Sequence, residues 1–169
     1  MARHNVENVR VFEEFSAAVS IAQSRVLIID RHLFSEDGEN PDHRNRIDKV
    51  VDWFFTEQLQ TVRILTGYHG SQNYIEEAFE QLETTVTEYR GRLGTPLNIE
   101  LSFALKDFDY VHDRFAIIDD ELWHFGATVG GFHRDVNAAS RGWSARSLGA
   151  IEFFDLAWQR SNAKGKKSS

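Results

Sequence analysis

The segment from which the fold can be argued most directly reads His112-Asp113-Arg114-Phe115-Ala116-Ile117-Ile118-Asp119. Its apolar centre is rich in β-branched and aromatic residues, which is typical of a β-strand. Alternate side chains of a strand lie on the same face, so His112 and Arg114 would point the same way. The sequence therefore predicts a strand that presents an imidazole and a guanidinium together at its beginning.

Two further strands are predicted on the N-terminal side of this segment. Residues 26–29 and 62–65 are apolar throughout, which is typical of strands buried on both faces. The spacing of apolar residues predicts helices over residues 7–22, around 47–55 and over 72–90, and the long stretch 31–45 is predicted to be a loop. Strands that alternate with helices in this way indicate right-handed crossovers and parallel pairing.

The C-terminal half completes the predicted sheet. We expect a strand over residues 97–105, a hairpin in which strands 114–118 and 122–125 meet across 119–121, and a closing helix over 151–159. The predicted fold is α/β, with a mixed, mainly parallel β-sheet flanked by helices on both faces. Residues 1–160 would form one domain, and residues 161–169 a disordered basic tail.

Composition limits the class of protein. The chain has 169 residues, enough for one domain with its own core, and its lack of cysteine excludes disulfides and thiolate metal sites. Neither a signal-peptide pattern nor an apolar run of membrane-spanning length is found, so we expect a cytoplasmic protein, with binding to a membrane surface left open. The net charge of -7 argues against a surface that is basic everywhere, but is compatible with a local basic groove.

The spacing of polar residues around the central segment is distinctive. His112 and Arg114 are followed after four residues by Asp119, and six residues later by Gly126-Ala127-Thr128. This spacing resembles the signature of the phospholipase D superfamily, His-x-Lys, four residues, Asp, six residues, Gly-Ser. The His-x-Arg form is similar to a prokaryotic branch of that superfamily linked to mobile elements and defence. The resemblance implies a phospholipase D-like domain.

The resemblance also implies a chemistry. His112 would attack phosphorus to form a phosphohistidine, Arg114 would steady the phosphoryl oxygens, and Asp119 would orient or tune a histidine. No metal or cofactor would be needed. Because this chain has one copy of a motif that the superfamily's site uses twice, a homodimer would complete the site. The expected function is a metal-independent phosphodiesterase, acting more readily on nucleic acid than on lipid.

Because of two departures from the superfamily pattern, the sequence does not decide whether the chain cleaves a phosphodiester or only binds it. Arg114 stands where the superfamily has lysine, and Ala127 stands where it has serine, although Thr128 could supply a hydroxyl to the substrate. Arginine keeps the charge and can bind phosphate with two parallel hydrogen bonds, but its planar fork differs from a compact ammonium. The alternative is a catalytically inactive module that binds nucleic acid, phospholipid headgroups or a protein partner. A purely structural subunit is a third reading.

Other polar residues carry weaker expectations. Tyr68 and His69 lie on a glycine-containing loop, and a substrate contact and a plain loop are equally good interpretations. His124 is interpreted as a hydrogen-bonded strand residue rather than as a second catalytic base. His32 and His43 lack partners at zinc-binding spacing, so no metal site is predicted.

Overall fold

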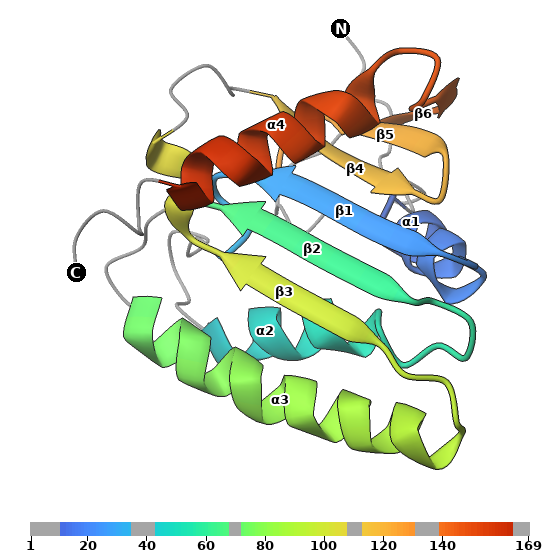
Figure 1. Cartoon of the computed structure of the whole chain (residues 1–169), viewed down its shortest axis with the longest axis vertical. Helices are drawn as coiled ribbons and strands as arrows, with labels where there is room; N and C mark the ends of the chain where they lie inside the picture. The colour runs from blue at the N-terminus through green and yellow to red at the C-terminus, as the bar shows by residue number, and fades with distance from the viewer. Residues whose placement is uncertain (1–10, 35–42, 68–71, 108–112, 131–138, 164–169) are drawn as a thin grey trace, which may run out of the picture.

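A mixed six-stranded sheet forms the centre of the molecule (Figure 1). The computed structural model describes residues 11–34, 43–67, 72–107, 113–130 and 139–163. In chain order, the elements are α1 (Val11–Ser20), β1 (Arg25–Asp30), α2 (His43–Asp52), β2 (Thr61–Thr66), α3 (Gln72–Arg92), β3 (Asn98–Ser102), the 3-10 helix η1 (Ala104–Asp107), β4 (Arg114–Ile118), β5 (Glu121–Phe125), β6 (Ala139–Ser144) and α4 (Ala150–Ala163). The strands lie in the order β3-β2-β1-β4-β5-β6.

The direction of the strands divides the sheet into two halves. β1, β2 and β3 are parallel, and helices α2 and α3 lie in the connections between them. β4 runs antiparallel to β1, and β5 and β6 continue in antiparallel pairs. The predicted α/β fold with a mixed sheet covered on both faces is confirmed, with its parallel pairing in β1–β3. The short turn between β4 and β5 requires antiparallel pairing, because parallel strands need a long crossover.

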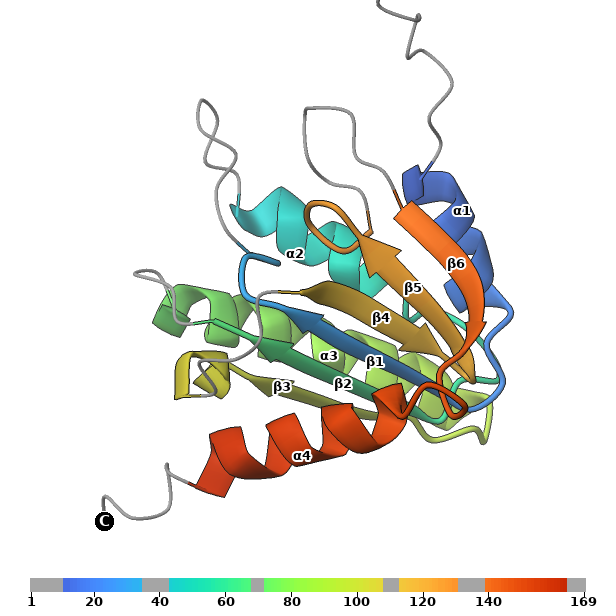
Figure 2. The same cartoon turned by 90° about the horizontal axis from the view of Figure 1, so that it is seen from above.

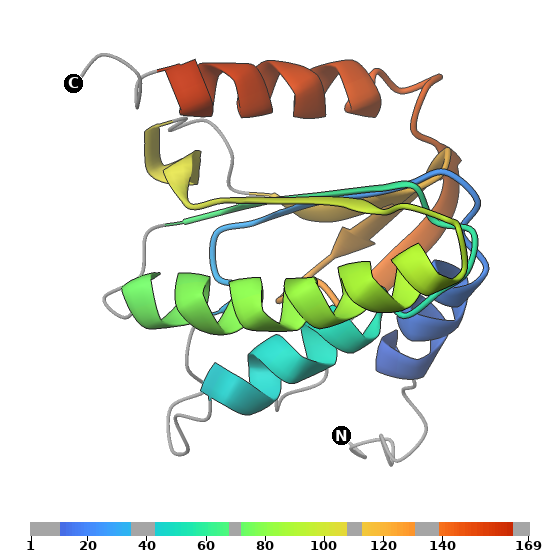
Figure 3. The same cartoon turned by 60° about the horizontal axis from the view of Figure 1, so that its bottom comes forward.

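Helices cover both faces of the sheet. α1, α2 and α3 lie on one face, and α4 lies with η1 on the other (Figures 2 and 3). Under α1–α3, the ring of Phe15 packs edge-on against Trp53, Trp123 and Phe125, with ring centroids 4.9–5.4 Å apart. The predicted burial of β1 on both faces is confirmed, since all its residues after Arg25 are buried.

Strand β6 was not predicted from the sequence. Its residues are mostly polar and exposed, so no alternation of apolar side chains marks it as a strand. Backbone pairing with β5 and side-chain contacts of Arg141 hold it in place. The guanidinium of Arg141 lies 4.3 Å from the ring centroid of Trp123 and donates hydrogen bonds to both carboxylate oxygens of Glu121.

The closing helix is longer than predicted. The sequence predicts residues 151–159, whereas α4 spans Ala150–Ala163. Residues 161–163 of the predicted tail therefore belong to the helix, and Ser161 is buried. The rest of that tail, residues 164–169, lies outside the described residues. Within the described ranges, none of the helices combines the length and the apolar character needed to cross a membrane.

Candidate functional site

Polar side chains from three neighbouring strands meet at one edge of the sheet. Asp30 and Thr66 end the parallel strands β1 and β2 side by side. Arg114 begins β4, one position beyond the Ile29–Phe115 pair of the antiparallel β1–β4 ladder, and so lies level with Asp30. Strand alternation places all three side chains on the α1–α3 face. Ligands of α/β sheets commonly bind at this kind of edge.

The carboxylate of Asp30 is the anchor of this edge. It is fully buried, and its two oxygens accept hydrogen bonds from the backbone N–H groups of His32 and Val129, each at 2.8 Å. The Nε of Arg114 lies 3.8 Å from the oxygen that His32 contacts. A buried charge is costly unless it is paired and hydrogen-bonded, and here both conditions are met. Asp30 therefore joins β1, the start of β4 and the segment after β5.

The backbone of Arg31, the residue after Asp30, lies close to the backbone of Gly67. The N–H of Gly67 donates to the Arg31 carbonyl at 3.3 Å, and a Cβ on Gly67 would lie 2.7–2.8 Å from Arg31 atoms. Only glycine fits there without displacing Arg31. Among the described residues, the buried Nε of Arg31 has no hydrogen-bond partner. An anion at this edge would provide one.

We call the edge formed by Asp30, Thr66 and Arg114 the Asp30 edge. Its electrostatic environment favours a neutral imidazole on His32. Partial burial lowers the pKa of His32 below its ordinary value, and the positive charges of Arg114 and Arg31 lower it further. Both effects favour the uncharged form of the ring. Arg114 is paired with the Asp30 carboxylate, and Arg31 lies close enough to His32 to act on it electrostatically, so two guanidinium groups are available near this edge for an anionic ligand. A neutral imidazole next to bound phosphate could accept a proton.

The structure places Asp119 away from this edge. It follows β4, five residues from Arg114, which corresponds to roughly 16 Å of extended strand. Its carboxylate accepts hydrogen bonds from the backbone N–H groups of Gln23, Ser24 and Arg25, at 3.0, 2.7 and 3.2 Å. Asp119 thus fastens the start of β1 to the β4–β5 turn. His112 lies outside the described residues, so the expectation that Asp119 orients a histidine of the site stays a prediction.

Replacement of Asp119 tests its structural role. Asp119→Ala removes three hydrogen bonds to a charged acceptor and puts alanine at a φ of 55°, so we expect a loss of about 2–4 kcal/mol in the free energy of unfolding. Asp119→Asn should lose less, because asparagine tolerates this conformation and keeps one acceptor oxygen. Urea unfolding measures both. Ligand binding per folded molecule should not change, whereas a role in the site would reduce it.

Of the other predicted site residues, Thr128 lies within the described ranges. Thr128 lies directly before Val129 and so comes to the Asp30 edge, but it is only 3% exposed. A substrate contact by its hydroxyl stays a prediction. His112, Tyr68 and His69 lie outside the described residues. β4 pairs antiparallel with β1, which brings the beginning of β4 to the ends of β1 and β2.

No individual site role was predicted from the sequence for Asp30, Arg31 or His32, although they lie at the end of a predicted strand, where ligands of parallel sheets commonly bind. One signal was present, a carboxylate at the end of an otherwise apolar buried strand. The partners of Asp30 could not be read from the sequence, because Val129 is 99 positions away. His32 was considered only as a metal ligand. Within the described ranges, no cluster of three or more His, Cys, Asp or Glu residues could hold a metal ion.

Similarity to known proteins is found among solved structures. No protein-family model and no curated protein sequence matches the chain. Among solved structures, TrmBL2, an archaeal chromatin protein with a novel mode of DNA binding, is similar with a TM-score of 0.43 and 14% identity. That match covers 89% of this chain, which spans about half of the archaeal protein (49%). NucT from Helicobacter pylori is similar with a TM-score of 0.49, 15% identity and 89% of each chain covered. Likenesses of this size assign neither a family nor an activity.

Proposed function

We propose that this chain is a metal-independent phosphodiesterase of the phospholipase D type that acts on nucleic acid. The observation that carries the proposal is the pair of arginines near the end of β1: Arg114, which is paired with the buried carboxylate of Asp30, and Arg31, which acts with Arg114 on His32. Arg114 stands two residues after His112 in the chain. Continued strand alternation would bring the His112 imidazole to the same face as this guanidinium.

The chemistry follows from the charge of the substrate. A phosphodiester is an anion, so its cleavage is helped by a neutral nucleophile and by cations on the nonbridging oxygens. In the proposed first step, a His112 nitrogen forms a bond to phosphorus while the bond to the leaving oxygen breaks. A second imidazole donates a proton to that oxygen. Water then attacks the phosphohistidine, gives its proton to the second imidazole, and releases His112.

A homodimer would supply the second imidazole. The motif occurs once, so His112 of the partner subunit would act as the acid in a two-fold symmetric site. Cleavage by a species that sedimentation shows to be monomeric would contradict the shared site. His32 then offers an imidazole on the same chain, close to the guanidinium groups.

One observation favours a second function, binding without turnover. Arg114 is ion-paired with a carboxylate that is fully buried, so part of its charge is already neutralised. The serine of the superfamily pattern is also replaced here by Ala127. A domain of this kind could hold a phosphate of nucleic acid, of a lipid headgroup or of a modified protein partner, without cleaving it.

Replacing Arg114 tests the proposed function. We expect wild-type protein to cut DNA, RNA or an aryl phosphodiester in excess chelator, and Arg114→Ala to slow cleavage by about 10²–10³-fold, because a donor to the developing charge is lost. Arg92→Ala, at an exposed position at the end of α3, makes the same charge change and should have little effect. Cleavage that requires magnesium would contradict the scheme. Binding that is lost in Arg114→Ala, with no turnover by wild-type protein, would support the binding function.

A further inference from the structure

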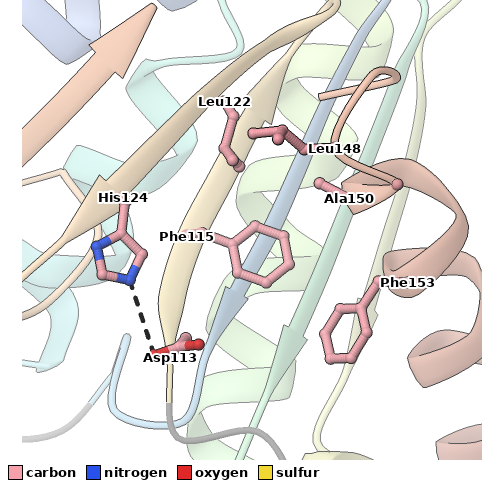
Figure 4. A pocket seen from close by; sticks show the side chains of 8 residues that line it. Asp113, Phe115, Leu122, His124, Leu148, Ala150 and Phe153 are labelled. Carbon is pink, nitrogen blue, oxygen red and sulfur yellow. Dashed lines mark ion pairs between the residues drawn. The ribbon is translucent and has the colours of Figure 1, made fainter. Parts of the chain in front are cut away.

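A concave site lies on the α4 face of the sheet, close to the beginning of β4. It is a pocket of about 390 Å³, within the roughly 300–1,000 Å³ usual for small ligands (Figure 4). Its walls are apolar and come from β4, β5 and the start of α4, with two polar residues at one side. The residues that matter for its chemistry are Phe115, Leu122, Leu148, Phe153, Asp113 and His124.

Two aromatic rings form one wall of the pocket. The rings of Phe115 and Phe153 lie 6.1 Å apart between centroids and tilt by 48°. Phe115 is buried, whereas Phe153 is 37% exposed, so part of its surface is available to a ligand. Leu148, at 60% exposed, extends the apolar surface. Such a wall suits a flat, uncharged ring that can lie against the aromatic faces.

The polar side of the pocket selects against anions. The Nε2 of His124 lies 3.7 Å from a carboxylate oxygen of Asp113, and both side chains are largely exposed. A phosphate or carboxylate would be repelled by Asp113. Ring N–H and amino groups would instead donate to that carboxylate, as the amino groups of nucleobases do when proteins read them. The pocket thus combines a stacking surface with an acceptor.

The pocket and the Asp30 edge adjoin the same strand end. Asp113 and Arg114 are consecutive, and strand alternation turns Asp113 and Phe115 towards α4 and Arg114 towards the opposite face. A polynucleotide that crosses this edge could therefore set a phosphate against Arg114 and turn a base to the other side of the sheet. The Asp30 edge would favour the anionic phosphate of a nucleotide, and the pocket would favour its uncharged base.

We propose that this pocket binds an unpaired nucleobase of a single-stranded nucleic acid whose phosphate lies at Arg114. The inference rests on the proposed function and makes it specific by naming a base-containing single strand as the ligand. The base must be unpaired, because a base in a duplex offers neither a free face nor its full hydrogen-bonding edge.

The test compares two probes, a single-stranded oligonucleotide and an abasic phosphodiester strand of equal length. We expect wild-type protein to bind the first more tightly, by fluorescence anisotropy. Phe153→Ala should weaken binding of the base-containing strand by about 5- to 150-fold and leave the abasic strand unaffected. Leu156→Ala removes a comparably exposed side chain of the same helix, outside the pocket, and should change neither affinity. Where the probe is cut, the measurement uses the His112→Asn background.

The outcomes separate the pocket from the phosphate site. Equal affinity of wild-type protein for the two probes, or equal weakening of both by Phe153→Ala, would overturn the pocket assignment while leaving the phosphate site intact. Binding of neither probe would overturn both proposals. If Phe153→Ala does not fold, Phe153→Leu removes the ring while keeping apolar volume, and the same selective loss is expected.

Discussion

His112→Asn is expected to lower the rate of phosphodiester cleavage by about 10⁴-fold or more, because asparagine cannot form the covalent bond to phosphorus. Binding of an uncut oligonucleotide should change little, since the guanidinium groups of Arg31 and Arg114 remain. The expected pattern is a collapse of kcat at nearly constant affinity. Single-turnover kinetics in excess chelator, together with anisotropy, measure the two quantities separately.

The nucleophilic role also predicts a trapped intermediate. Wild-type protein quenched during turnover should carry the phosphoryl-bearing fragment of the substrate on histidine, in an acid-labile and alkali-stable linkage, and His112→Asn should carry none. Unfolding midpoints of the two proteins should agree, which shows that the loss is not a loss of fold. Cleavage at an undiminished rate by His112→Asn would show that His112 is not the nucleophile. His32 would then be the candidate for that role.

Asp30→Ala should cause the largest loss of stability among the changes considered. The substitution deprives the backbone N–H groups of His32 and Val129 of their acceptor and leaves Arg114 without its counter-charge. Removing one partner of a buried, hydrogen-bonded ion pair costs about 3–5 kcal/mol, and we expect the lower part of that range because Arg114 is partly exposed.

The measurement is the free energy of unfolding in urea, and Asp155→Ala provides the control. Asp155 is exposed on α4, and its replacement changes the net charge by the same amount, so its free energy of unfolding should stay within about 0.5 kcal/mol of wild type. Asp30→Asn should fall between the two, because its amide oxygen can still serve one of the two N–H groups. A loss below about 1 kcal/mol for Asp30→Ala would show that the carboxylate is not the anchor of this edge.

Much of the sheet could be predicted because its signals are local. The apolar runs in β1 and β2 and the short polar turn between β4 and β5 each lie within a few residues. Strand β6 could not be predicted, because its position depends on pairing with β5 and on the contact of Arg141 with Trp123. Such partners are defined only by the folded chain.

Of the residues in the candidate site, only Arg114 was singled out from the sequence. Arg114 was identified from the spacing of the central segment, and the structure places it at a strand-end edge. Asp119 has the spacing of a site residue, yet its carboxylate binds backbone groups at the far end of β4. Sequence spacing gives the distance between two residues along a strand. It does not show at which end of the strand the ligand-binding residues gather.

Among the residues that the structure describes, β6 is the last strand on its side of the sheet, and this position has a consequence for self-association. An unpaired strand edge is a template on which another chain can continue the sheet, and proteins guard against this with charged side chains and irregular pairing. Here Arg141 projects from the strand, Gly142 takes a φ of 105°, and the pairing with β5 shifts register at Leu122 and Trp123. Lateral growth of the sheet through this border is therefore disfavoured, and two copies would have to meet through another surface.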